Sequence, residues 1–157
     1  MKEYTVSFFG HRSIQNFCLV EKRARALIRT LLLEQEYIEF LVGCHGQFDE
    51  MISCVIREEK RKLRDDNSSL VLVLPYPTAA LHHQPENLLH HYDEVEICSQ
   101  AAACHPKAAI QVRNRQMVDR SDLVVFCVEH QRGGAYQTMR YAQRKGKRIE
   151  RLSSAGR

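Results

Sequence analysis

The sequence predicts an α/β protein with a Rossmann-like open parallel sheet of about five strands, flanked by helices on both faces. Short apolar runs alternate with amphipathic helical periods along most of the chain. The run Leu70–Pro75 (LVLVLP) is apolar throughout, as expected of a parallel strand that is covered on both faces. A chain of 157 residues, 44% of them hydrophobic, suits a single core.

Each predicted element follows from its hydrophobic period. The strands are predicted at Tyr4–Phe9, Tyr37–Val42, Leu70–Pro75, Leu123–Val128 and Arg148–Leu152. Helices are predicted over residues 17–31, 48–56, 110–120 and 134–145, where apolar side chains recur at three- and four-residue spacing. Strands that alternate with helices imply right-handed crossovers and therefore a parallel sheet.

One domain is predicted over residues 1–152, followed by a flexible tail at 153–157. Residues 76–107 lack clear periodicity and are expected to form an irregular or lid-like insertion. The segment is too long for an ordinary connection, so it either holds a short helix or strand or acts as a lid.

Composition limits the classes of partner. The net charge of +4 is mild, which argues against nucleic acid as a partner. The chain has no apolar run of transmembrane length and no signal peptide before the first strand, so we expect a cytoplasmic protein without a membrane partner. The six cysteines form no C-x-x-C pair and fit buried thiols in a reducing compartment.

Glycines and polar or cationic residues follow three of the predicted strands. In open α/β sheets, ligands bind beyond the carboxyl ends of the strands. Glycines let a backbone approach a ligand closely, and helix N-termini favour anions. The candidates are Gly10, His11 and Arg12 after the first strand, Gly43, His45, Gly46, Phe48, Asp49 and Glu50 after the second, and Arg132, Gly133 and Gly134 after the fourth. We therefore expect an anionic small molecule, such as a nucleotide or a sugar phosphate.

The stretch Val112–Asp122 (VRNRQMVDRSD) is a further candidate. On a helix, Arg113 and Met117 share one face, whereas Asn114 faces elsewhere. Arg115 and Arg120 fit equally well on a solvated surface.

No metal and no cofactor is expected. The pairs His82–His83 and His90–His91 lie in the irregular segment, and adjacent histidines lack the i, i+4 spacing that presents two imidazoles to one ion. The chain has neither a G-x-x-x-x-G-K nor a G-x-G-x-x-G fingerprint, so the standard NTPase and NAD-binding modes lack support.

Four motifs together resemble a known family. SFFGHR, GCHGQFDEM, VRNRQMVDRSDLVV and GGAYQTMRYAQRKGK are similar, in this order, to the YpsA-like branch of the SLOG superfamily. That superfamily is Rossmann-like and includes DprA-type proteins and the lonely-guy (LOG) phosphoribohydrolases. The matching segments extend from residue 5 to residue 150; residues 78–105 match poorly.

The resemblance implies a pocket that binds or senses a nucleotide or nucleotide-derived ligand, such as an ADP-ribose-like molecule. Carried over by position, its residues are Gly10, His11, Arg12, Gly43, Gly46, Phe48, Asp49, Arg113, Asn114, Gly133, Gly134 and Tyr136. Relatives of this fold commonly dimerise, so a homo-oligomer is an open expectation.

The resemblance also contains a departure that bears on catalysis. LOG enzymes carry a G-G-x-G-T-x-x-E pattern whose glutamate works with an arginine of the preceding helix. Here Arg113 resembles that arginine, but Arg140 stands at the glutamate's position, which removes the acid that would stabilise a developing oxocarbenium ion. We therefore expect binding without LOG-type catalysis. The alternative is an N-glycosidase, resembling the phosphoribohydrolases or the deoxyribosyltransferases, that uses Asp49 or Glu50.

Overall fold

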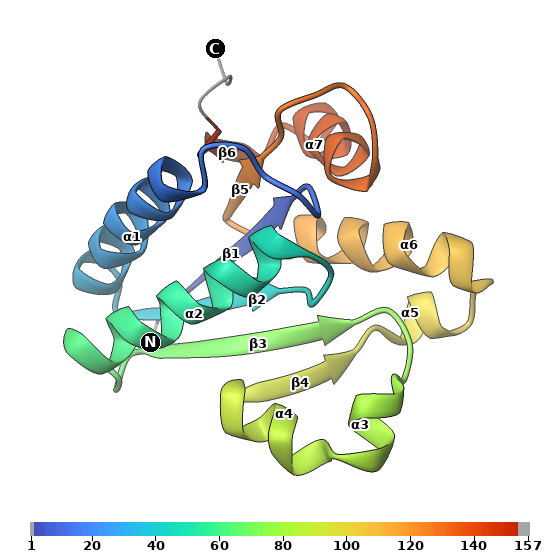
Figure 1. Ribbon diagram of the computed structural model, residues 1–157, viewed down its shortest axis with the longest axis horizontal. Helices are drawn as coiled ribbons and strands as arrows, with labels where there is room; N and C mark the ends of the chain where they lie inside the picture. Colours follow the sequence, from blue (N-terminus) through green and yellow to red (C-terminus); the bar gives the residue numbers. More distant parts are fainter. Residues whose placement is uncertain (1, 154–157) are drawn as a thin grey trace.

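A computed structural model describes residues 2–153 of the chain. It contains a six-stranded, all-parallel sheet in the order β4-β3-β2-β1-β5-β6 (Figure 1). The strands are β1 (Glu3–Gly10), β2 (Tyr37–Val42), β3 (Ser68–Leu74), β4 (Glu94–Ile97), β5 (Leu123–Cys127) and β6 (Arg148–Arg151). The helices are α1 (Phe17–Glu34), α2 (Gln47–Lys62), α3 (Ala79–His83), α4 (Pro85–His91), α5 (Ser99–Ala102), α6 (Pro106–Asp119) and α7 (Gly134–Arg144). The predicted open parallel sheet with flanking helices is confirmed.

Two apolar clusters cover the two faces of the sheet. One joins α1 and α2 to the strands, with Ile28 and Ile52 fully buried in it. The other joins α5, α6 and α7 to the opposite face, around Leu41 and Phe126. Because both faces are covered, the central strands are apolar on both sides, and every residue of β3 and β5 is buried.

The sheet has one strand more than expected, because β4 lies inside the segment predicted to be irregular. That segment holds α3, α4, β4 and α5 in succession. In β4, Glu94 and Glu96 alternate with Val95 and Ile97, and none of the four is fully buried. The strand lies at the edge of the sheet, so its sequence lacks the apolar run by which the inner strands were recognised.

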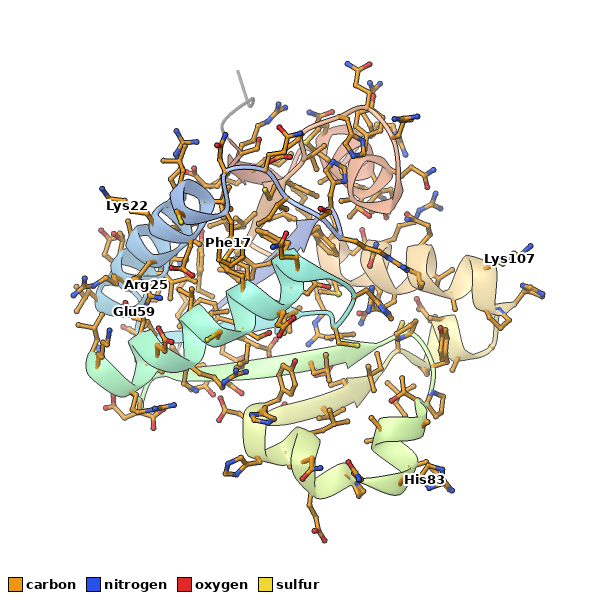
Figure 2. The ribbon with its side chains drawn as sticks, in the orientation of Figure 1. Phe17, Lys22, Arg25, Glu59, His83 and Lys107 are labelled. Carbon is orange, nitrogen blue, oxygen red and sulfur yellow. The ribbon has the colours of Figure 1, made fainter. Side chains whose placement is uncertain are left out.

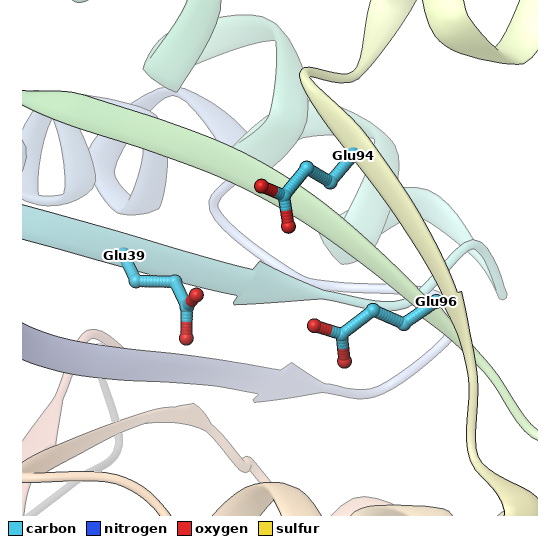
Figure 3. Close-up of side chains that lie close together, drawn as sticks. All are labelled: Glu39, Glu94 and Glu96. Carbon is cyan, nitrogen blue, oxygen red and sulfur yellow. The ribbon is translucent and has the colours of Figure 1, made fainter.

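Arg120 connects β4 to the rest of the sheet. Figure 3 shows Glu39 of β2 with Glu94 and Glu96 of β4, whose carboxylate oxygens lie within 4.8 Å of one another. The Arg120 guanidinium bonds Glu96 at 2.8 Å and Glu39 at 3.2 Å. Arg120 is therefore an ion-pairing residue that offsets the repulsion of this acidic cluster, rather than a freely solvated side chain.

The remaining expectations concern the chain end, the cysteines and membranes. Ser153, assigned to the flexible tail, is buried, and its hydroxyl donates to the Val128 carbonyl at 3.2 Å; residues 154–157 lie outside the described residues. The six cysteines are free thiols, but only Cys98 and Cys127 are buried. Within residues 2–153, no helix combines the length and apolar character needed to cross a bilayer.

Candidate functional site

The loops that follow β1, β2 and β5 meet at a cavity of about 470 Å³, hereafter the ligand cavity. The strand order reverses between β1 and β5, since β2, β3 and β4 lie on one side of β1 whereas β5 and β6 lie on the other. Such a switch point leaves a crevice beyond the carboxyl ends of the strands. Of the predicted residues, Gly10, His11, Arg12, His45, Asp49, Arg113, Asn114, Gly133 and Gly134 line the cavity.

Two of the predicted glycines allow the protein to pack against itself. A Cβ on Gly10 would lie 2.3 Å from the Phe48 ring. Gly46 has a φ of 103°, and a Cβ there would lie 2.5 Å from the Cα of Arg12. The N–H of Gln47 donates to the Arg12 carbonyl at 2.7 Å. The contacts of Arg12 with Gly46 and Gln47 hold loop one (residues 11–16) against loop two (residues 43–46) and the start of α2, and both glycines are needed for close packing within the protein.

Six predicted residues lie outside the lining of the ligand cavity: Gly43, Gly46, Phe48, Glu50, Arg132 and Tyr136. Phe48 is fully buried in the core beneath Gly10, because it lies on the inner face of α2. Glu50 is exposed and lines a different hollow, which it shares with Gly46. Tyr136, in the first turn of α7, packs against the core and accepts a hydrogen bond from Arg140. Arg132 is exposed and does not line the cavity.

Gly43 is also absent from the lining, but it makes room for two buried charged groups. A Cβ on Gly43 would lie 2.9 Å from the Asp49 carboxylate and 3.3 Å from the Arg113 guanidinium. Asp49 is 9% exposed and Arg113 4% exposed. The two side chains therefore converge over Gly43 at the base of the cavity, where an alanine would take the space.

The charge of Arg113 has hydrogen-bond partners but no ion-pair partner. Its Nε donates to the Asn114 side chain at 3.0 Å, and its Nη1 donates to the Val73 carbonyl at 3.0 Å. Among residues 2–153, no carboxylate lies within 4.0 Å of it. Burial lowers the pKa of Arg113, and nearby Asp49 opposes that shift. A buried cation without an ion pair, at the wall of a cavity, is suited to receive an anion.

Asp49 is the one carboxyl in the described lining of the ligand cavity. Its Oδ2 accepts the His45 N–H at 3.0 Å. Burial raises the pKa of Asp49 to about 6, although the His45 hydrogen bond and the charge of Arg113 act in the opposite direction. A carboxyl with such a pKa can hold or release a proton near neutral pH.

A hydrogen-bonded chain fixes α6 against α7. Asn114 Nδ2 donates to the Thr138 hydroxyl at 3.0 Å, and that hydroxyl donates to the Gly134 carbonyl at 2.8 Å. The prediction that Asn114 faces away from Arg113 was wrong, because adjacent helical positions differ by only about 100° and both side chains are buried here. The motif gave no sign of Thr138, whose role depends on the helix that packs opposite it.

The start of α7 is open toward the cavity. Its cap residue Gly133 has a φ of 90°, and its first turn carries no acidic residue. Within residues 2–153, the N–H groups of Gly134, Ala135 and Tyr136 have no hydrogen-bond partner. Three free N–H groups at the positive end of an 11-residue helix are suited to receive an anion.

Two exposed cations also belong to the lining of the ligand cavity. Arg12 and Lys107 line the same cavity and are exposed; Figure 2 shows Lys107 at the beginning of α6. Sequence reasoning missed Lys107, as well as Gln111 in the lining, because Lys107 ends the segment without periodicity. The signal available in the sequence was the proline at 106, which is common in the first turn of a helix.

His11 does not act as the cation that the sequence predicted. It is 7% exposed and stacks on His130, with ring centroids 3.8 Å apart and planes inclined by 6°. The His130 N–H donates to His11 Nε2 at 3.5 Å. Burial, followed by the charge of His130, lowers the pKa of His11. The lowered pKa disfavours the charged form of His11, so Arg12 supplies the positive charge of loop one.

No protein-family model matches the chain, and no curated protein does. Solved structures match in fold. DNA processing protein A (DprA) from Streptococcus pneumoniae aligns with a TM-score of 0.67 and 14% identity, over 94% of this chain and 50% of that one. DprA from Helicobacter pylori aligns with a TM-score of 0.65 and 14% identity, over 94% of this chain and 64% of that one. The chain thus spans roughly half to two thirds of the length of these proteins.

These neighbours show the fold that the chain shares with DprA, and membership of the SLOG superfamily and of its YpsA-like branch stays a prediction. They also correct an expectation. The H. pylori structure describes a binding mode for single-stranded DNA, so excluding nucleic acid as a partner was wrong. Net charge over a whole chain does not describe a local surface: the ligand cavity here is lined by Arg12, Lys107 and Arg113 with a single carboxyl.

Proposed function

We propose that the chain binds a nucleotide unit through its phosphate, either in a free nucleotide-derived ligand or within a single strand of DNA. The observation that carries the proposal is the open start of α7 in a cavity that Lys107 and the buried Arg113 also line. Free backbone N–H groups, a helix dipole and cations at one position match the charge and the acceptor oxygens of a phosphate. The single-stranded DNA bound by H. pylori DprA and an ADP-ribose-like ligand both contain this group.

Fluorescence anisotropy and calorimetry test the proposal. Labelled oligothymidylates represent the strand, and AMP and ADP-ribose represent the free ligands. Lys107→Ala is expected to weaken whichever ligand binds by roughly fivefold to tenfold, since one charge-assisted contact contributes about 1–1.5 kcal/mol. For a strand, the affinity should also fall linearly with the logarithm of the salt concentration.

The matched control is Lys22→Ala. Lys22 is an exposed lysine on α1, and Figure 2 shows it at the opposite end of the molecule from Lys107. It changes the net charge equally but touches no part of the cavity. Equal losses from the two variants would contradict a local phosphate site, and so would the absence of binding by every probe.

Asp49 supports a second candidate, hydrolysis of the N-glycosidic bond of a nucleotide. A buried carboxyl with a pKa of about 6 lines the cavity, although a carboxylate opposes the binding of an anion. In the proposed reaction, protonated Asp49 gives its proton to the base nitrogen while the C1′–N bond breaks. Water then adds to C1′, and its proton returns to Asp49. Glu50 has no part in this scheme because it lines a different hollow.

Asp49→Asn separates this chemistry from the structural role of Asp49. An asparagine oxygen can still accept the His45 N–H, which now bonds the carboxylate at 3.0 Å. Chromatography of nucleoside monophosphates incubated with wild type should show free base, and the variant should release none while it still binds. Wild-type protein that binds the nucleotides without releasing base would reject catalysis and leave the binding proposal intact.

A further inference from the structure

A second hollow lies on the other side of loop two. Its volume is about 560 Å³, and it is lined by Arg12, Ser13, Cys44, Gly46, Gln47, Glu50 and Tyr92. Arg12 lines this hollow and the ligand cavity alike. The two spaces are therefore neighbours, with one arginine at their common boundary.

The backbone of Arg12 is fixed, whereas its charge is free. The Arg12 carbonyl accepts the Gln47 N–H at 2.7 Å. The Arg12 Cα also packs so closely against Gly46 that a side chain at position 46 would not fit. Its guanidinium is exposed, and within residues 2–153 it has no hydrogen-bond or ion-pair partner. A cation held at such a boundary suits a phosphate that links a group in one space to a group in the other.

The second hollow suits an uncharged aromatic group. Glu50 is exposed at its rim, and its carboxylate disfavours a second phosphate inside the hollow. Tyr92 is half-buried, is partly packed against the core, and lines the hollow beside the polar side chains of Ser13 and Gln47. A nucleobase has this character, since it is neutral, flat and rich in hydrogen-bonding groups, and it stacks on tyrosine.

We infer that the site binds two consecutive nucleotides of a single strand, the first in the ligand cavity and the second in the hollow at Tyr92, with their linking phosphate at Arg12. This inference rests on the proposed binding of a nucleotide phosphate at α7. It names the ligand class as a strand of at least two nucleotides. It also assigns Tyr92 as the residue that contacts the second base.

Three thymidine ligands test the inference by calorimetry on the wild-type chain: the 5′-monophosphate, the 3′,5′-bisphosphate, and the 5′-phosphorylated dinucleotide. The bisphosphate adds the phosphate expected at Arg12 but no second base. We expect the dinucleotide to bind roughly tenfold more tightly than the bisphosphate, because stacking contributes about 1–3 kcal/mol per base.

Tyr92 variants supply the second arm. Tyr92→Ala should reduce the dinucleotide to the affinity of the bisphosphate and leave the monophosphate unchanged, whereas Tyr92→Phe should retain the gain. If Tyr92→Ala does not fold, the wild-type ligand series still decides the question. A dinucleotide that gains nothing over the bisphosphate, while the monophosphate binds, overturns the second position alone. Failure of all three ligands overturns the phosphate site itself.

Discussion

The starts of α2 and α7 look alike in the sequence and differ in what they can bind. Each helix follows a central strand and begins at a glycine with positive φ, 103° at Gly46 and 90° at Gly133. At α2 the first turn contains Asp49 and Glu50, and the Arg12 carbonyl accepts the first N–H. At α7 the first turn has no acid, and a Cβ on Gly133 would meet nothing within 4 Å. The difference leaves the positive end of α7 available to a ligand, whereas the protein itself neutralises the positive end of α2.

The largest expected effect separates the two glycines. Gly46→Ala carries two penalties, an unfavourable φ and a Cβ that would lie 2.5 Å from the Arg12 Cα. Gly133→Ala carries only the unfavourable φ. We expect Gly46→Ala to lower the free energy of unfolding by about 3 kcal/mol or more, and Gly133→Ala by about 1–2 kcal/mol. Urea denaturation of both variants measures this. Equal losses would mean that loop one moves to accommodate the Cβ, and that the start of α2 is packed no more tightly than the start of α7.

The pH dependence of stability tests the internal charge at the start of α2. The pKa of Asp49 is raised by burial from 3.8 to about 6, so the folded protein holds this proton more tightly than the unfolded chain. The contribution of Asp49 to stability is therefore complete below pH 4 and is lost as the pH rises from about 4 to about 6.

The size of that loss is at most about 3 kcal/mol. Asp49→Asn, which cannot ionise, should remove this part of the slope and be more stable than wild type at pH 8. Denaturant titrations at half-unit intervals from pH 4 to pH 8 measure both effects. Glu50→Gln is the control for losing an exposed carboxyl from the same helix turn. Parallel curves for wild type and Asp49→Asn would refute the assignment.

The smallest expected effect on stability comes from adding an acidic side chain near the start of α7, as α2 already has. Gln137 lines the ligand cavity, and Gln137→Glu places an acid of the same shape there. The dipole should stabilise the fold by about 0.3–1 kcal/mol, while repulsion weakens the phosphate ligand roughly tenfold. Thermal melts measure the gain in stability, and calorimetry measures the loss of ligand affinity. Gln143→Glu, at the other end of α7, should leave binding unchanged; a loss as large as that of Gln137→Glu would contradict a local effect.

The sequence was sufficient to predict the position of a residue wherever its surroundings followed from the pattern of its own segment. The apolar runs located β1, β2, β3 and β5, and the strand ends brought Arg12, Asp49 and Gly133 to one cavity. It failed where a neighbour from another segment decides the role. Phe48 and Asp49 are adjacent in the chain, yet one fills the core and the other lines the cavity.

His11 and Lys107 also show that local patterns do not reveal contacts between segments. The surroundings of His11 differ from those expected, and Lys107 was not predicted at all. His11 is predicted with Arg12 as a polar or cationic group for an anion, but it is buried beside His130, which lowers its pKa and disfavours its charged form. Lys107 was passed over because its own segment has no period, although the fold brings it to the cavity. In both cases the missing information was the arrangement of the loops around the end of β1, which no local pattern contains.

The short strand β4 covers β3, which would otherwise be an edge strand. Without it, β3 would form the edge of the sheet, and its sequence SSLVLVL joins high β-propensity to the absence of charge, which is the composition of an aggregation-prone segment. β4 pairs with four of its residues and presents Glu94 and Glu96 at the rim instead. Its attachment is secured at both ends of the strand, by Asp93 bound to Lys60 and the Leu70 N–H, and by Glu96 bound to Arg120. These ion pairs thus hold β4 over a strand whose composition favours edge-to-edge pairing.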